Sequence, residues 1–406
     1  MSTRRTHPAT VFVRGFGTVE GLEWGLWLAL TVFWIVDLNL QPFELILLGV
    51  VLEGAVLLSE TPTGVIADVR SRRQSLIIAQ LLMAASFIWA FASDEFWVIL
   101  PAQALVGIGW TFRSGADTAW VTDELMGRGD FDDDDIEQLL LKKHRMGMIV
   151  SLVVGPVTIA FGWWQSVQWI GIALGLAYLA IAGWMALVMT EDHFTPGKDR
   201  DQGFVETLRT GVRTVRTVAP LRVLVAVVVL VSLGAEAFDR LGFVHFLDSV
   251  GVDELDASGQ SLLALGVLFF IAALGGISVN LGAQKFLESG RGVARLAAGL
   301  LVIAAVGGVL AAATGAVAVI GLGYLLQDSV REAMWPVMEG WANRDAPTEV
   351  RATVHSLMGQ TMSVGAIGGG LLLAAVAEAV SIPAAMIGGA VFFGLGGVVA
   401  TRGFVR

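Results

Sequence analysis

Twelve apolar stretches, each about the length of a bilayer-spanning helix, determine what this chain can fold into. A transmembrane helix needs about 20 mostly apolar residues. Stretches of that kind occupy residues 12–36, 43–62, 75–93, 96–121, 146–165, 167–190, 220–246, 259–282, 293–313, 315–337, 354–378 and 382–401. Only 15% of the residues are charged, against about 25% in a soluble domain. The sequence therefore predicts an all-α membrane protein with twelve transmembrane helices.

Basic residues gather in alternate connections between these stretches. The intervening loops carry no Lys or Arg and hold acids such as Asp37, Asp94 and Asp253. Because Lys and Arg are retained on the cytoplasmic side of a membrane, the basic loops and both termini are predicted to be cytoplasmic. Arg4 and Arg5 could begin a signal peptide, but no small-residue cleavage site follows, so we expect the first helix to be retained.

A polar segment separates the first six stretches from the last six. The sequence predicts an N-terminal six-helix bundle at 1–190, a cytoplasmic linker at 191–219 and a C-terminal six-helix bundle at 220–406. In the linker, apolar residues recur at helical spacing: Phe204, Leu208, Val212 and Val215. This spacing predicts an amphipathic helix on the cytoplasmic leaflet. A solvated basic linker is the alternative.

The two halves share charged motifs at a nearly constant separation. Glu20-x2-Glu23 recurs 216 residues later as Glu236-x2-Asp239. A second motif, Gly109-x3-Arg113-x3-Asp117, recurs 214 residues later as Gly323-x3-Gln327-x3-Arg331. Internal structural repeats of a transporter place equivalent motifs at one offset. The sequence therefore predicts a duplicated six-helix unit with pseudo-two-fold symmetry.

The loop between the second and third predicted helices carries a compact charged motif. Its members are Gly64, Asp68, Arg70, Arg72 and Arg73. The glycine permits close approach of a neighbouring helix, and the aspartate can pair with the arginines in a charge network. The motif resembles the cytoplasmic signature of the major facilitator superfamily. That resemblance implies two six-helix bundles and a gate that the charge network holds in one conformation and releases in another.

Further segments resemble one branch of that superfamily, the drug:proton antiporters that include tetracycline- and macrolide-type efflux proteins. Segments 60–63 and 114–125 match this branch, and 236–241 and 350–354 are similar to its uncharacterised members. The superfamily's antiporters also carry a Gly-Pro motif in helix 5, which corresponds to Gly155-Pro156 here. The glycines expected soon after the proline are absent, so an ordinary proline-kinked helix is the alternative.

Polar residues inside the predicted helices mark the candidate site. A charge at mid-membrane costs at least ~2.5–3.5 kcal/mol on insertion scales, so such groups pair or face a wet cavity. In the superfamily that the chain resembles, helices 1, 4, 7 and 10 line that cavity. The corresponding residues here are Glu20, Glu23, Arg113, Asp117, Glu236, Asp239, Arg240, Gln327, Asp328 and Arg331.

The two acids of helix 1, Glu20 and Glu23, lie one turn apart on one face. We expect one of them to bind a proton, a cationic substrate, or each in turn, because a partly desolvated carboxylate can alternate between its neutral and ionised forms. The alternative is a static ion pair with Arg14, Arg113 or Arg240.

Spacing also predicts ion pairs within single helices. Arg113 and Asp117, four residues apart, are expected to pair, either as structural neutralisation or as a switch that protonation opens. Asp328 and Arg331 form a similar pair in helix 10, and helix 7 carries Glu236, Asp239 and Arg240. Tryptophans on or near helices 4 and 10 either face hydrophobic or cationic compounds or anchor the helices at the interface; they are Trp110, Trp120, Trp335 and Trp341.

These residues and the resemblance together predict a secondary active transporter that exports hydrophobic or cationic small molecules in exchange for protons by alternating access. The alternatives are a proton-linked importer or facilitator of a small polar solute, and a non-transporting membrane sensor on the same fold. Neither a phosphate-binding loop nor a nucleophile–base pair is visible, so we do not expect an enzyme. The five scattered histidines and the lack of cysteine indicate no metal site.

The expected energy source is the proton gradient, without a cofactor. The expected partners are a small-molecule substrate, protons and the lipid bilayer, and not nucleic acid. We expect a monomer, located as a multi-pass protein in the cytoplasmic membrane of a prokaryote.

Overall fold

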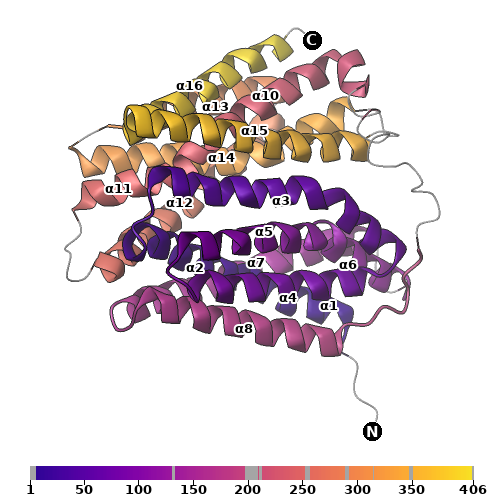
Figure 1. The fold of residues 1–406 in the computed structure, drawn as a ribbon. Coiled ribbons are helices and arrows are strands. Elements are labelled where there is room, and N and C mark those ends of the chain that lie inside the picture. Colours follow the sequence, from indigo (N-terminus) through magenta and orange to yellow (C-terminus); the bar gives the residue numbers. More distant parts are fainter. Residues whose placement is uncertain are drawn as a thin grey trace. The chain divides into compact units, whose positions relative to one another are not determined.

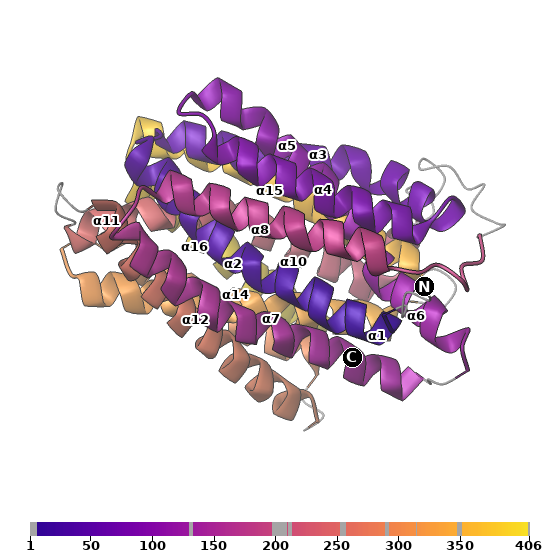
Figure 2. The ribbon, with the colours of Figure 1, turned by 90° about the horizontal axis from the view of Figure 1, so that it is seen from below.

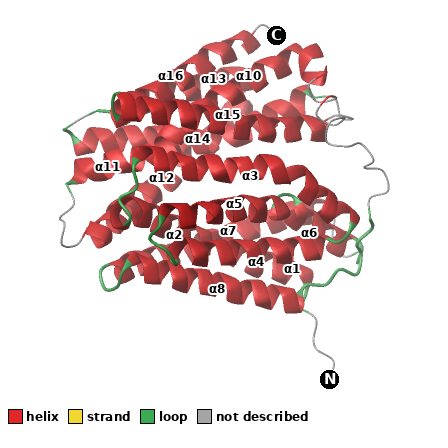
Figure 3. Cartoon of the chain, in the orientation of Figure 1, coloured by secondary structure: helices red, strands yellow, loops and turns green. Residues whose placement is uncertain are grey.

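The computed structural model of the chain describes residues 6–129, 133–196, 209, 213–251, 257–288, 292–313, 315–346 and 351–404. In these ranges the regular structure is entirely helical (Figure 3). Ten of the helices in the described ranges are long and apolar enough to cross a membrane. The helical class is therefore confirmed, and the count of twelve spans stays a prediction. Most of the predicted linker helix lies outside the described residues.

Two predicted spans are helical but are not among those ten. The single helix expected at 96–121 is instead two, α5 (Phe96–Arg113) and α6 (Ala116–Met126). Gly115 between them has a φ of 71°, a left-handed conformation that glycine adopts without strain and that ends the first helix. The other span is α14 (Val317–Asp345), whose middle carries several charged residues.

The chain divides into two compact units. The first comprises Met1–Asn39, Gly54–Asp201 and Glu254–Leu263, and the second comprises Leu40–Glu53, Gln202–Asp253 and Ala264–Arg406. The division therefore passes through two helices, α3 (Pro42–Val69) and α12 (Ala257–Glu288). The predicted boundaries at 190 and 220 stay a prediction.

Helix 1 of the first unit is a continuous helical segment of several parts. It consists of α1 (Pro8–Thr10), a π-helical turn at Val11–Phe16, α2 (Gly17–Val32) and a second π-helical turn at Phe33–Asp37. Around it, α2 packs against α7 (Asp133–Gly162) and α8 (Val167–Val188), and α4 (Arg72–Phe91) packs against α5 and α8. Figure 2 shows α2 between α7 and α8.

Glycines let α2 and α7 approach closely. Gly17, Gly21 and Gly25 recur every four residues along α2, and a Cβ built on Gly21 would lie 2.5 Å from the Cβ of Val150 on α7. Such small residues allow the backbones of membrane helices to touch. The predicted Gly155-Pro156 element lies inside α7, which continues past the proline to Gly162. This packing brings the first half of α7 beside the acids of α2.

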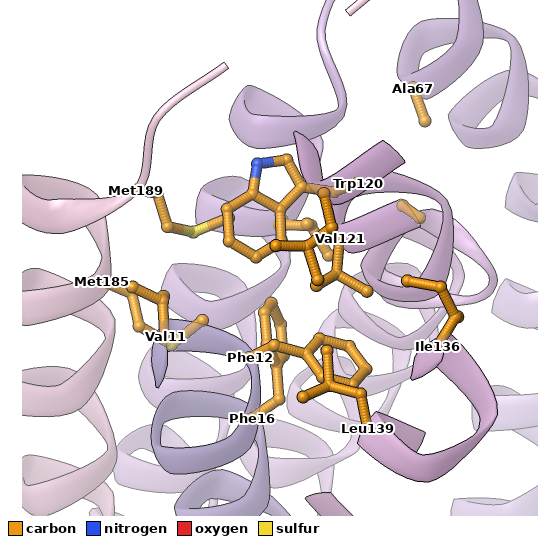
Figure 4. Close-up of a cluster of buried hydrophobic side chains, with 13 residues drawn as sticks. Val11, Phe12, Phe16, Ala67, Trp120, Val121, Ile136, Leu139, Met185 and Met189 are labelled. Atoms are coloured by element: carbon orange, nitrogen blue, oxygen red, sulfur yellow. The ribbon is translucent and has the colours of Figure 1, made fainter. Parts of the chain in front are cut away.

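An apolar cluster holds α6 in the first unit. Trp120 is only 1% exposed and packs near Phe12, Phe16, Met185 and Met189 (Figure 4). Its Nε1 donates a hydrogen bond of 2.7 Å to the Thr190 carbonyl. Trp120 is thus a packing residue of this core rather than a ring that faces a solute.

The second unit contains the remaining long helices. Helix 7 consists of α10 (Ala219–Glu236), a π-helical turn at Ala237–Leu241 and α11 (Gly242–Val250). It is joined by α13 (Val293–Ala311), α14, α15 (Arg351–Ala379) and α16 (Ile382–Thr401). Within this unit α13 packs against α14 and α16, and α10 packs against α15 and α16 (Figure 1).

Candidate functional site

A cavity of about 310 Å³ lies in the first unit beside the acids of α2. Its lining consists of five charged residues, two aromatic residues and a serine: Glu20, Glu23, Arg113, Asp117, Lys143, Phe16, Trp110 and Ser114. Four residues predicted from helices 1 and 4 therefore meet in one place. Lys143, Phe16 and Ser114 were not predicted as site residues.

Glu23 is the most firmly held acid of this cavity. It is 7% exposed, and Arg113 binds it with two nitrogens, Nη1 at 2.5 Å from Oε1 and Nη2 at 3.1 Å from Oε2. The hydroxyl of Tyr178 on α8 donates a further hydrogen bond of 2.9 Å to Oε1. Of the static partners expected for the helix-1 acids, Arg113 is the one that the structure places on Glu23.

Asp117 pairs with a different helix from the one predicted. Its Oδ2 lies 3.1 Å from Nζ of Lys143 on α7, and its Oδ1 accepts the amide of Thr118. The expected intrahelical pair between Arg113 and Asp117 is therefore wrong. The chain turns at Gly115, so the two residues belong to separate helices and do not share one helical face.

A third acid–base pair joins α2 to α7. Glu20 Oε1 lies 2.9 Å from Nδ1 of His144, and the two side chains are 37% and 66% exposed. The backbone of α7 is close here, since a Cβ built on Gly147 would lie 3.2 Å from Cδ of Glu20. Glu20 is thus the acid of this site with the most access to water.

Trp110 gives the cavity an aromatic wall. The Arg113 guanidinium carbon lies 4.9 Å from the centre of its ring, and the residue is 46% exposed. An exposed indole offers a face to hydrophobic or cationic groups. The cavity therefore combines two complete acid–base pairs, the acid of a third pair and one accessible aromatic surface.

The predicted gate motif forms a charge network with α6. Arg72 pairs with Asp123 and lies 3.8 Å from Asp68, whereas Arg70 is exposed. The expected role of Gly64 in close helix packing is not observed, because a Cβ built on it would meet no atom of the described chain within 4 Å.

The third arginine of the motif binds the end of α8 and the residues that follow it. Arg73 donates to the carbonyls of Met189 and Ala186 at 2.9 and 2.6 Å. Its backbone amide donates to Glu191, which also accepts the Ser71 hydroxyl at the start of α4. The gate motif is therefore tied to residues 186–191 as well as to α6.

Glu124 on α6 holds residues 190–193, which continue this segment. It is 1% exposed and accepts the Thr190 hydroxyl at 2.9 Å and the amides of Asp192 and His193 at 2.6 and 2.8 Å. Arg128 lies 3.6 Å away. Sequence reasoning did not predict these contacts, because none of the spacings links α6 to residues 190–193.

The second unit contains a counterpart of the Glu23–Arg113 pair. Arg331 on α14 binds Asp239 of the π-helical turn at 2.7 Å and Asp328 at 3.0 Å, the latter as its spacing predicts. Arg331 is thus the partner of the helix-7 acid. Gln327, which the repeat aligned with Arg113, is instead fully buried, and its amide has no hydrogen-bond partner among the described residues.

The remaining predicted residues of helix 7, Glu236 and Arg240, lie one turn apart. The closest recorded approach is 3.8 Å, between Arg240 Nε and Glu236 Oε2. Glu236 is 8% exposed. This pair is as long as the Arg72–Asp68 pair of the gate motif and longer than the ion pairs of Glu20, Glu23, Asp117 and Asp239.

Tyrosine is a signal that sequence reasoning missed. The chain has only two, and both are buried, Tyr178 on α8 and Tyr324 on α14. Tyr178 bonds to Glu23, and Tyr324 lies within electrostatic range of Asp239, Asp328 and Arg331. A residue type this rare in an apolar chain, present at both arginine–acid pairs, could have indicated the two sites.

A metal centre finds no support in the described part of the chain. No group of three or more His, Asp or Glu residues there is arranged to hold an ion. The chemistry that these residues can perform is the exchange of protons and of ion-pair partners.

The sequence profile of the Major Facilitator Superfamily matches residues 144–370. A curated protein of Bacillus subtilis (strain 168), the uncharacterized MFS-type transporter YxaM, is 20% identical over 391 residues, which cover 93% of this chain and 91% of that protein.

Solved structures of several transporters share the fold. The nucleoside transporter NupG superposes with a TM-score of 0.78 at 14% identity, covering 98% of this chain and 99% of that one. A bacterial homologue of the human lysosomal transporter Spinster gives 0.75 at 14% identity, with 100% and 98% covered. A POT family transporter in complex with 5-aminolevulinic acid gives 0.70 at 13% identity, with 98% and 95% covered.

Proposed function

The chain belongs to the Major Facilitator Superfamily of membrane transporters, and from that premise we propose that it exports hydrophobic or cationic small molecules in exchange for protons. The transport cycle is alternating access, and the proton gradient supplies the energy without a cofactor. This assigns the chain to the drug:proton antiporter branch that segments 60–63 and 114–125 resemble.

The observation that carries this proposal is the cavity of the first unit. Its acids, Glu20, Glu23 and Asp117, each bind a basic side chain from another helix. A cationic solute can compete with those bases for a carboxylate, and a proton can displace the solute in turn. Trp110 adds an accessible aromatic face for an apolar or cationic ring.

The proposal includes the membrane topology. Ten described helices are apolar spans, and α5 and α14 supply the two further crossings that twelve helices need. An even number of crossings places both termini on the same side, which the basic loops make the cytoplasmic side. We place the protein as a monomer in the cytoplasmic membrane of a prokaryote.

The test uses purified protein in proteoliposomes with ethidium as the probe cation. We expect an imposed pH gradient to drive ethidium against its concentration gradient, and ethidium addition to cause proton movement. Trp110→Ala should weaken ethidium transport severalfold, whereas Trp169→Ala, at an exposed position of α8, should leave it unchanged. An absence of any ethidium-dependent proton movement in the unaltered protein would contradict the export proposal.

A second candidate function is proton-linked uptake of a small polar solute. Five of the eight cavity-lining residues are charged, which favours a solute with several hydrogen-bonding groups. The same proteoliposomes, supplied with radiolabelled uridine because the nucleoside transporter NupG shares the fold, separate the two functions. Uptake of uridine driven by the pH gradient, without transport of ethidium, would favour the importer.

A further inference from the structure

The buried acids of the described chain differ sharply in how they are solvated. Three acidic side chains are buried there: Glu23, Glu124 and Glu236. Glu23 accepts three hydrogen bonds, and Glu124 also accepts three. For Glu236, Oε2 is enclosed without a hydrogen-bond partner among the described residues, and Arg240 Nε lies 3.8 Å from it. Of these three acids it is the one with an enclosed carboxyl oxygen that no donor reaches at hydrogen-bond distance in the described chain.

Two glycines enclose this carboxyl group within the second unit. A Cβ built on Gly49 of α3 would lie 2.6 Å from Glu236 Oε2, and one built on Gly370 of α15 would lie 3.4 Å from its Cγ. Glycine at both positions leaves just enough room for the acid. Neither residue brings a side-chain donor, so the surroundings exclude water without replacing its hydrogen bonds.

The charges around Glu236 come from three helical elements. Its own helix contributes Arg240 and Asp239, α3 contributes Glu53, and α14 contributes Arg331. The two positive charges of the arginines are balanced by the two negative charges of Asp239 and Glu53. Arg240 Nε, at 3.8 Å, is beyond hydrogen-bond distance, and Arg331 is engaged by Asp239 and Asp328. These groups do not supply the donors that a buried carboxylate needs.

The π-helical turn at Ala237–Leu241 separates Glu236 from the neighbouring arginine–acid pair. In an α-helix, residues three apart share a face. The wider π-helical turn rotates Asp239 further from Glu236, so that Asp239 reaches Arg331 on α14 while Glu236 packs against α3 and α15. The helix therefore presents two acids to two different environments.

An ionised carboxylate that is buried without hydrogen bonds is far more costly than the neutral acid. We propose that Glu236 takes up and releases a proton during transport, whereas Glu23 keeps its pair with Arg113. In the conformation described, Glu236 carries the proton. When the surroundings of α10 open to water, the proton leaves to water and the ionised carboxylate is hydrated. This inference rests on the proposed proton coupling.

The test is infrared difference spectroscopy of the protein in lipid vesicles, titrated with pH and without any substrate. A protonated carboxyl group has a C=O stretch that disappears on ionisation. We expect that band in the unaltered protein, its loss in Glu236→Gln and its retention in Glu23→Gln. Glu236→Asp, which keeps a carboxyl group, should restore the band. Its absence from the unaltered protein, its retention in Glu236→Gln or its loss in Glu23→Gln instead would overturn the assignment.

Transport measurements separate this inference from the proposed function. Glu236→Gln should lose ethidium transport driven by a pH gradient yet keep the exchange of internal for external ethidium, because exchange requires no net proton movement. If the unaltered protein moves no protons with ethidium, the export proposal fails whatever the infrared result. If the unaltered protein is coupled and Glu236→Gln remains coupled, only the assignment to Glu236 fails.

Discussion

The pair between Glu23 and Arg113 makes a quantitative prediction about stability. Replacing Arg113 with methionine removes two hydrogen bonds, of 2.5 and 3.1 Å, from a carboxylate that is 7% exposed. Only the Tyr178 hydroxyl then remains to solvate the charge. Removing one partner of a buried ion pair costs about 3–5 kcal/mol, because the other charge is left uncompensated. We expect Arg113→Met to lower the free energy of unfolding by that amount.

The double variant tests the cause of this loss. With Glu23→Gln added, no buried charge is left, and the glutamine can still accept the Tyr178 hydrogen bond. Replacing a buried ion pair by hydrophobic residues of similar volume is often close to neutral, and this double variant likewise leaves no unpaired charge. The double variant should therefore recover about 2 kcal/mol or more relative to Arg113→Met, a coupling in the range found for residues in contact.

Equilibrium unfolding in mixed micelles, followed by tryptophan fluorescence, measures these differences. Arg145→Met is the matched control, because Arg145 is an exposed arginine of α7 and its loss should change stability by about 0.5 kcal/mol or less. If Arg113→Met is as mild as Arg145→Met, or if Glu23→Gln adds to its loss instead of reversing it, Glu23 is not held as a buried ion.

Three further variants test other parts of the first unit. Gly21→Ala places a Cβ 2.5 Å from Val150, so overpacking should lower the free energy of unfolding by about 1–3 kcal/mol. Gly183→Ala is its control, because a Cβ there meets no atom within 4 Å in the described chain. Equal stability of the two variants would contradict the α2–α7 packing. Glu124→Gln should speed amide hydrogen exchange at His193 by weakening a charge-assisted hydrogen bond; unchanged exchange would refute the role of Glu124. Tyr178→Phe removes one hydrogen bond from Glu23 and should lower the free energy of unfolding by about 0.5–1.5 kcal/mol in the same assay. Unchanged stability would show that this hydrogen bond is absent.

Hydropathy was sufficient to predict where the long helices lie, but not where a helix is interrupted. Apolar windows located the long helices of the described ranges, because a membrane requires similar length and composition of every span. The same windows merged α5 and α6, since Gly115 and its neighbours are as apolar or small as helix interiors. The left-handed turn there depends on the φ of one glycine, which no window average detects.

Ion-pair partners were predictable within a helix and not between helices. Asp328 and Arg331 paired as their spacing requires, because the helix itself fixes that geometry. The partner of Asp117 is Lys143, which the windows assigned to a loop. Its position depends on the glycines that set the distance and register of α2 against α7. Helix register is a tertiary property, and no local spacing determines it.

In the structure, the two acids of the repeated motif have different partners. Glu20-x2-Glu23 and Glu236-x2-Asp239 are equivalent in the sequence repeat. In each, the second acid binds an arginine from the fourth helix of its half with two contacts, Glu23 with Arg113 and Asp239 with Arg331.

The first acid of each motif lacks such an arginine clamp. Glu20 faces His144 with partial access to water, and Glu236 is buried with Oε2 lacking a hydrogen-bond partner in the described chain. The second acids are therefore suited to hold helices together through their arginines, whereas the first acids are not bound in that way. If both halves keep this difference between the first and the second acid, the first acids should matter more for the pH dependence of ethidium transport. Glu20→Gln should then alter that pH dependence more than Glu23→Gln does. In the second unit, Glu236→Gln should alter it more than Asp239→Asn. The opposite order in both halves would show that the arginine-bound acids are the ones that titrate.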